Sequence, residues 1–255
     1  MVDISLITAT LNSADTLADC LESVKKQNLC VEHIVVDGGS DDETLAIASQ
    51  YSGHLSHVIP GPDKGIYDAM NKGITACSSE VVGILNSDDF YPSDDILSRI
   101  SSLFENPEIQ ACYGDLVYVD RAENDVERIC RYWRAGPYRG AKQFYYGWMM
   151  PHPTLFVRRS VYEQYGMFNL EMGTAADYEL MIRLFVKNRI NVEYLPRVIV
   201  HMRAGGVSNA SLGNRFRANR MDRKAWKVNG IKPYFWTLSL KPVRKIGQWV
   251  FRAVE

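Results

Sequence analysis

Hydrophobic and polar residues alternate in blocks along the N-terminal part of the chain, and the blocks predict strands and helices in turn. The apolar run Ile4 to Ala9 ends in the turn-prone segment Thr10 to Asn12, after which Ala14 to Gln27 carries apolar residues at helical spacing. The β-branched run His33 to Asp37 is followed by a second helical pattern, Asp42 to Tyr51. This order predicts a parallel sheet whose ligands bind at the carboxyl ends of its strands.

Similar patterns continue for most of the chain. They predict strands at Leu55 to Ile59, Val81 to Leu85, Ala111 to Tyr118, Pro153 to Val157 and Val192 to Leu195, and helices at Gly65 to Ala76, Ser93 to Phe104, Val161 to Tyr165 and Ala175 to Lys187. Residues 121 to 143 are polar, aromatic and weakly periodic, which indicates a long excursion or a hairpin. The 255 residues suit one α/β domain, residues 1–214, with an appended tail, residues 215–255.

Charged residues are distributed unevenly between these two parts. The formal net charge is −1, but the tail holds 11 Lys and Arg against 2 Asp and Glu, so it carries about +9 and the rest about −10. Aromatic residues alternate with these basic residues: Trp226, Tyr234, Phe235, Trp236, Trp249 and Phe251. This composition predicts two short amphipathic pieces on an anionic membrane surface, with a solvated basic helix or packing of the aromatics on the domain as the alternatives.

The cysteines and the N-terminus bear on the compartment. Five cysteines are scattered without a C-x-x-C pair, which favours neither a disulfide framework nor a zinc site. Asp3 stands where a signal peptide would carry basic residues, and no apolar stretch approaches the length of a membrane span. We therefore expect a cytoplasmic protein.

A polar, glycine-rich turn follows the second predicted strand, at Asp37 to Asp42. Polar side chains at this edge can hydrogen-bond a nucleobase or ribose, and the glycines allow close approach of the backbone. A helix-entry turn capped by Ser40 or Asp41 explains the same residues without a ligand.

Four polar residues, Asn86 to Asp89, directly follow the apolar run Val81 to Leu85. Mg²⁺ and Mn²⁺ prefer carboxylate oxygens and leave positions open for substrate phosphates, so these carboxylates suit a diphosphate leaving group. A helix cap ahead of Pro92 is the alternative.

Asp177 is a third candidate, near the first turn of a predicted helix and three residues before the core-facing Leu180. A carboxylate there is either a general base or a residue favoured by the helix dipole. His152 and His201 are flanked by apolar residues or proline, which suits buried, hydrogen-bonded histidines as well as ligands.

Five segments occur in a recognisable order along the chain: Thr10 to Asn12, Val36 to Ser40, Gly65 to Gly73, Leu85 to Asp89 and Asp177 to Leu180. In this order and at these separations they resemble the family 2 glycosyltransferases of the GT-A fold. The match covers about residues 3 to 207. The segment Gly65 to Gly73 is similar to that of the branch of this family whose members decorate bacterial exopolysaccharides.

The resemblance implies a GT-A-like α/β fold, with a Rossmann-related, mostly parallel sheet flanked by helices and a helical, basic C-terminal tail. It implies an inverting, metal-dependent glycosyltransferase of bacterial cell-surface polysaccharide synthesis. The donor would be a nucleotide-diphosphate-sugar, the acceptor a hydroxyl of a saccharide or lipid-linked saccharide, and the metal Mg²⁺ or Mn²⁺. We expect no nucleic-acid partner, and a location in the cytoplasm or on the inner face of the cell membrane.

The resemblance also implies roles for single residues. Thr10, Asn12 and Asp37 would bind the nucleoside, Asn86 would accept from a ribose hydroxyl, Asp88 and Asp89 would bind the metal and diphosphate, His201 would be a further metal ligand, and Asp177 would be the base. Residues 205 to 208 resemble a segment that closes near the diphosphate.

Three positions depart from the family's common pattern, in which each is an acid. Gly38 stands where an acid often touches the nucleobase, so the choice between uracil and guanine stays open. Asn86 brings no charge to the cation. Ala176 leaves Asp177 as the sole candidate base in its segment.

Two other classes of function remain open on the sequence. The same strand-end acids suit a metal-dependent nucleotidyltransferase or phosphohydrolase, although the body shows no G-x-x-x-x-G-K motif. The third class is a non-catalytic nucleotide-binding module. The acid at Asp177 counts against this class, because such a module does not need a base.

Overall fold

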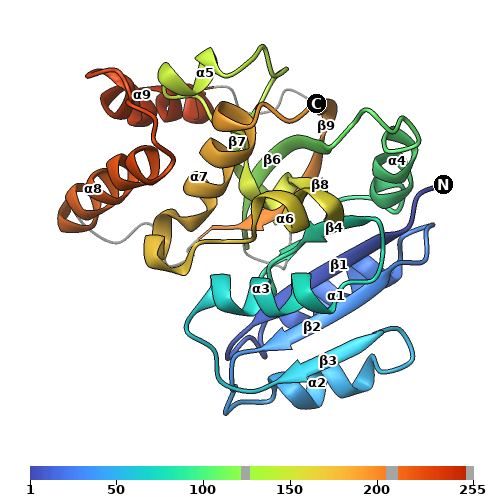
Figure 1. The fold of residues 1–255 in the computed structure, drawn as a ribbon. Coiled ribbons are helices and arrows are strands. Elements are labelled where there is room, and N and C mark those ends of the chain that lie inside the picture. The colour runs from blue at the N-terminus through green and yellow to red at the C-terminus, as the bar shows by residue number, and fades with distance from the viewer. Residues whose placement is uncertain (122–126, 205–211, 251–255) are drawn as a thin grey trace.

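The computed structural model describes residues 1–121, 127–204 and 212–250, so the closing segment predicted at residues 205 to 208 lies outside it. The described strands join in one sheet of order β3-β2-β1-β4-β8-β6-β9-β5, with β7 paired to β6 (Figure 1). They are β1 (Ile4–Thr10), β2 (Glu32–Asp37), β3 (His57–Pro60), β4 (Val81–Ile84), β5 (Asp89–Phe90), β6 (Ala111–Arg121), β7 (Glu127–Trp133), β8 (Phe156–Arg158) and β9 (Val192–Arg203).

The first four strands form the parallel half of the sheet. β1 pairs in parallel with β2 and β4, and β2 pairs in parallel with β3. Beyond β4 the sheet is mixed, because β8 is antiparallel to β4 and β6 whereas β9 is parallel to β6. The predicted α/β fold with a parallel start is confirmed. The antiparallel pair of β6 and β7 matches the hairpin alternative for residues 121 to 143.

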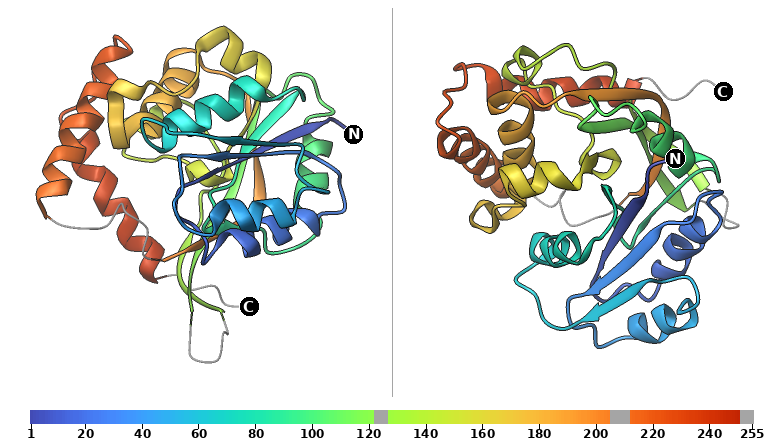
Figure 2. Two further views of the ribbon diagram at one scale, coloured as in Figure 1. Left: turned by 90° about the horizontal axis from the view of Figure 1, so that it is seen from below. Right: turned by 45° about the vertical axis from the view of Figure 1, so that its right-hand side comes forward.

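Helices cover both faces of this sheet (Figures 1 and 2). They are α1 (Leu17–Lys25), α2 (Thr44–Gln50), α3 (Ile66–Ala76), α4 (Ile96–Leu103), α5 (Lys142–Tyr145), α6 (Arg159–Tyr165), α7 (Ala176–Met181), α8 (Leu212–Val228) and α9 (Thr237–Val250), with the short η1 (His152–Thr154), η2 (Leu170–Ala175) and π-helical η3 (Ile182–Lys187). The helix predicted at Ala175 to Lys187 is thus divided between α7 and η3.

Alternation along the buried strands sends successive side chains to opposite faces of the sheet. On one face, Ile7 and Val36 join a core cluster with Ile74 of α3. On the other face, Val35 packs with Leu17 of α1. Both helix layers are therefore fixed by the strands between them, and the loops between strand and helix emerge at the carboxyl edge.

β9 is longer than predicted. The prediction ended at Leu195 because Pro196 and Arg197 interrupt the apolar pattern, but the strand continues to Arg203. The pairing register of β6 and β9 shifts at Asp115, which accommodates the interruption. The extension lets β9 reach β5 and the segment after β4.

The described part of the C-terminal tail packs on the domain, with α8 and α9 beside α7 and α5 (Figures 1 and 2). Trp226 is fully buried, and its indole N–H donates to the Tyr178 hydroxyl at 3.0 Å. The Tyr145 ring packs at a tilt against Trp226 and Tyr234, with ring centroids 4.7 and 4.8 Å away. Phe235, in contrast, is 87% exposed. Among the described helices none is both long and apolar enough to span a bilayer.

Candidate active site

The loops that follow β1 and β2 meet at the carboxyl edge of the sheet. Thr10 and Asp37, the last residues of the two strands, are paired in register. The Asn12 side-chain oxygen accepts the backbone N–H of Asp41 at 3.0 Å, and the backbone N–H of Asn12 donates to the Ser40 hydroxyl at 2.9 Å. The residues predicted to bind a nucleoside therefore lie on two connected loops.

Asp37 is buried, and its carboxylate organises the turn after β2. It accepts the backbone N–H groups of Gly39 at 3.0 Å and Ser40 at 2.9 Å. The helix-entry alternative is right about the end of this turn but not about the residue, because the N–H of Thr44 at the start of α2 donates to Asp42 at 2.9 Å and not to Ser40 or Asp41. The start of the turn is held by Asp37, and its end leads into α2.

The segment after β4 holds buried polar atoms whose hydrogen-bonding capacity is unused. The Asn86 amide N–H donates to the Asp89 carboxylate at 2.9 Å. The other oxygens of these two side chains, and the Thr10 hydroxyl on neighbouring β1, have no hydrogen-bond partner within the described residues. The helix-cap alternative fails here, since Asp95 is the N-cap residue of α4. Buried unpaired acceptors are costly, so this site suits a cation or a polar ligand group.

The surroundings of the two adjacent acids disfavour their charged forms. Burial raises the pKa of Asp88, and burial followed by repulsion from Asp88 raises the pKa of Asp89 well above its usual range. Arg203 opposes both shifts. A divalent cation would relieve the same repulsion. Within the described ranges, no three or more His, Cys, Asp or Glu side chains are grouped to hold a metal ion.

Arg203, at the end of β9, was missed by the sequence analysis. Its Nη2 pairs with Asp19 at 2.5 Å, and its Nη1 donates to the backbone carbonyl of Asp88 at 3.4 Å. The guanidinium lies 5.1 Å from the centroid of the Phe90 ring. No local pattern predicts this position, because it depends on the pairing of β5 with β9. A guanidinium beside Asp88 suits a phosphate group.

His201 lies on β9 directly opposite Phe90, with ring centroids 5.3 Å apart. Asp89 lies opposite the next residue, Met202. Because successive side chains of a strand point to opposite faces, Asp89 points away from the face that carries His201. The structure brings both residues to one strand pair but not to one face, and the role of His201 as a metal ligand stays a prediction.

Asp177 lies in the first turn of α7 and is half-buried. Burial, and after it the charge of Asp177, raises the pKa of Tyr67 in α3. Burial lowers the pKa of His152, and the charge of Asp177 counteracts that shift. Phe168 packs against both, with ring centroids 5.2 Å from Tyr67 and 5.4 Å from His152. Since α3 begins at the carboxyl edge, these neighbours put Asp177 at that edge too. Tyr67 was not among the predicted site residues, although its segment was singled out.

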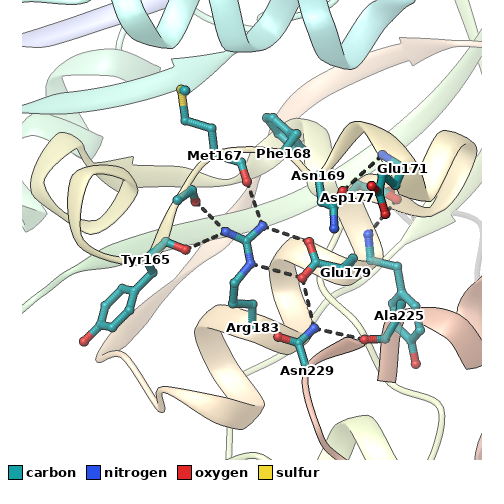
Figure 3. A network of polar contacts seen from close by, with 12 residues as sticks. Tyr165, Met167, Phe168, Asn169, Glu171, Asp177, Glu179, Arg183, Ala225 and Asn229 are labelled. Atoms are coloured by element: carbon teal, nitrogen blue, oxygen red, sulfur yellow. Dashed lines mark hydrogen bonds and ion pairs between the residues drawn. The ribbon is translucent and has the colours of Figure 1, made fainter. Parts of the chain in front are cut away.

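An arginine-centred network fixes the helix that carries Asp177 (Figure 3). Arg183 donates to the backbone carbonyl of Met167 at 2.7 Å and pairs with the buried carboxylate of Glu179 at 2.8 Å. Asn229, just after α8, donates to the same carboxylate at 3.0 Å. The network ties α7 to the segment before Phe168 and to the tail, and it occupies the carboxylate of Glu179.

Comparison with protein families matches residues 5–166 to the model described as Glycosyl transferase family 2. The chain is 30% identical over 218 residues to a PGL/p-HBAD biosynthesis glycosyltransferase of Mycobacterium bovis BCG, which covers 83% of this chain and 81% of the relative. It is 24% identical over 200 residues to the succinoglycan biosynthesis protein ExoU of Rhizobium meliloti, which covers 71% of this chain and 56% of that protein.

Solved structures share the fold. S. aureus TarS in complex with UDP-GlcNAc superposes with a TM-score of 0.70 at 17% identity, over 93% of this chain and 69% of that chain. The mannosyltransferase PcManGT from Pyrobaculum calidifontis, in complex with GDP-Man and Mn²⁺, gives a TM-score of 0.63 at 15% identity, over 100% of this chain and 79% of that chain. At such low identities, these comparisons show that the arrangement of helices and strands is shared, and they show the fold alone.

Proposed function

This chain belongs to glycosyl transferase family 2, and from that premise we propose that it transfers a sugar, with inversion, from a nucleotide-diphosphate-sugar to an acceptor hydroxyl. It is a glycosyltransferase with the GT-A fold, as expected from the order of its motifs. The expected link to bacterial cell-surface polysaccharide synthesis is supported by the similarity to a PGL/p-HBAD biosynthesis glycosyltransferase and to a succinoglycan biosynthesis protein.

We assign the general base to Asp177. In an inverting transfer the acceptor oxygen attacks the anomeric carbon, the bond from that carbon to the diphosphate breaks, and the acceptor proton passes to the base. One observation carries this assignment: the half-buried Asp177 carboxylate lies at the carboxyl edge beside Tyr67 and His152. The other acid in this turn, Glu179, is held by Arg183.

The donor nucleoside is proposed to bind to Thr10, Asn12 and Asp37. The joined loops after β1 and β2 and the unpartnered Thr10 hydroxyl support this, because that hydroxyl can accept or donate a hydrogen bond. Asn86, whose side-chain oxygen is also unpartnered within the described residues, would accept from a ribose hydroxyl.

A Mg²⁺ or Mn²⁺ ion is proposed to bind to Asp88, with the more deeply buried Asp89 as a further ligand. The unpartnered Asp89 oxygen and the raised pKa of both acids fit a cation. When bound, such an ion compensates the charge of the departing diphosphate. Arg203 adds a fixed positive charge beside Asp88. The Mn²⁺ named for PcManGT supports the choice of metal.

The tail is proposed to hold a cytoplasmic enzyme against an anionic membrane, where lipid-linked acceptors would lie. Its charge of about +9 and the exposure of Phe235 (87%) and Tyr234 (46%) support contact with a lipid surface. Trp226 is buried and is not available for this contact.

A thermal-shift screen tests the proposed function. UDP-, GDP- and dTDP-sugars are added with and without Mn²⁺, and free monosaccharides serve as controls. A donor at a hundred times its Kd is expected to stabilise the protein by about 2.7 kcal/mol, more with Mn²⁺ than without it. If no nucleotide-sugar raises the melting temperature above that of the controls, the proposed function is wrong.

A further inference from the structure

The loop between β3 and α3 places a carboxylate against the end of β2. A Cβ atom added to Gly38 would lie 2.5 Å from Oδ2 of Asp63. The other carboxylate oxygen, Oδ1, accepts the backbone N–H of Gly65 at 2.7 Å. Asp63 is therefore held in a defined orientation, and only a glycine at position 38 leaves room for it.

Strand order places this carboxylate at the far end of the donor site. β2 is two strands away from β4 in the sheet, which corresponds to about 10 Å at the usual spacing of neighbouring strands. A nucleoside diphosphate whose phosphates lie near Asp88, after β4, reaches this distance with its base. The Thr10 hydroxyl on the strand between them is buried and unpartnered within the described residues, so the edge offers a second polar group to the same ligand.

The chemistry of a carboxylate distinguishes nucleobases. An ionised carboxylate only accepts hydrogen bonds. Uracil and guanine present a ring N–H on the edge used for base pairing, whereas cytosine and adenine present a ring nitrogen lone pair there. A carboxylate placed against this ring position therefore accepts a hydrogen bond from the first two bases and meets a lone pair on the last two, which disfavours them.

We propose that Asp63 is a specificity-determining residue that accepts a hydrogen bond from the ring N–H of a uracil or guanine base. The proposal rests on the proposed function, in which this edge of the sheet binds a nucleotide-sugar. Its contribution to the site is separate from that of Asp37, whose carboxylate also accepts the backbone N–H groups of Gly39 and Ser40.

Two substitutions test the proposal in different ways. In Asp63→Asn, the amide oxygen can keep the bond to Gly65 while the amide N–H groups replace the acceptor that faces the base. In Gly38→Ala, the new Cβ displaces the Asp63 carboxylate without removing it, and the backbone of residue 38 is compatible with alanine because its φ is not positive. Glu43→Gln is the matched control, since it neutralises an exposed acid just beyond the turn after β2.

The experiment is calorimetric titration of the full chain with UDP, GDP, CDP and ADP in the presence of Mg²⁺. We expect the wild type and Glu43→Gln to bind UDP or GDP more tightly than CDP and ADP. Asp63→Asn should weaken binding of the favoured nucleotide by roughly tenfold to a hundredfold, the usual range for a hydrogen bond to a charged group, and should shift the preference towards CDP or ADP. Gly38→Ala should lose the preference in the same direction. Circular dichroism melts confirm that each variant is folded.

Each remaining outcome overturns a defined claim. If the wild type binds nucleotides without preference, or if folded Asp63→Asn and Gly38→Ala keep the wild-type preference, the role of Asp63 is wrong while the proposed function stands. If no nucleotide binds to the wild type, the proposed function fails and this inference fails with it.

Discussion

Asp88 and Asp89 are neighbours in sequence with different surroundings. Asp89 is fully buried in β5 and accepts a hydrogen bond from Asn86, whereas Asp88 is half-buried. Asp88 is therefore the acid that is more accessible to a cation from solvent. Replacement of Asp89 would also remove the buried acceptor of the Asn86 amide N–H, so it is the less informative variant.

The metal proposal predicts that Asp88→Ala lowers turnover by roughly a hundredfold or more, because the departing diphosphate loses several kcal/mol of charge compensation. Excess EDTA should abolish wild-type turnover, and added Mn²⁺ should restore it. Asp94→Ala, an exposed acid in the following turn, is the control and should keep full activity. Full wild-type activity in excess EDTA would remove the metal from the account.

At the residue scale, the sequence located most candidates but did not orient them. Asp37, Asp88 and Asp177 follow strands or begin a helix, and such positions are readable from local patterns. The opposite faces of Asp89 and His201 depend on the register between β5 and β9, which local patterns do not contain.

At the scale of elements, the network around Arg183 joins α7, the segment before Phe168 and the end of α8 (Figure 3). Its central carboxylate, on Glu179, is 3% exposed. The network therefore stabilises the helix that presents Asp177, and it does so through contacts between segments far apart in the chain.

We predict that Arg183→Ala lowers the free energy of unfolding by about 3 to 5 kcal/mol, because it leaves a buried carboxylate without its partner. Lys26→Ala is the control, since the exposed Lys26 forms an i,i+4 pair with Glu22 on the surface of the protein. That variant should lose less than about 1 kcal/mol. Urea denaturation measures both, and equal losses for the two variants would show that the network contributes no more than a surface ion pair.

The predictability of the elements follows the strength of their local pattern. α3 was predicted from Gly65 to Ala76 and runs from Ile66 to the same end, since its apolar spacing is regular. β9 was cut short because a proline interrupts its pattern, and only pairing with β6 and β5 extends it. This longer strand brings Arg203 to the site. The prediction therefore omitted Arg203 for the same reason that it ended β9 too early.

At the scale of the whole molecule, the tail combines inward and outward aromatic residues. Trp226 packs in the core cluster that includes α7, whereas Phe235 projects into solvent. The composition of the tail predicted both membrane contact and packing as alternatives. The structure supports packing for Trp226, and the membrane contact remains a proposal.

Flotation with liposomes tests that proposal. The protein should float with anionic vesicles at low salt, less so at high salt, and Phe235→Ala should weaken the association. Val58→Ala, which truncates a partly exposed side chain on distant β3, should not change it. Basic residues near an anionic surface contribute about 1 kcal/mol each and are screened by salt. A protein that never floats at low salt rules the proposal out.

The most direct test of the account is the effect of Asp177→Asn on turnover and on donor binding, both measured with the donor that the thermal-shift screen identifies. The amide keeps the size of the side chain but cannot take the acceptor proton, so turnover should fall by about 10²- to 10⁴-fold while the calorimetric donor affinity stays unchanged. Glu171→Gln, at an exposed acid of the adjacent η2, is the control and should behave like the parent. Turnover of Asp177→Asn close to that of the parent would contradict the account, because the base would then lie elsewhere.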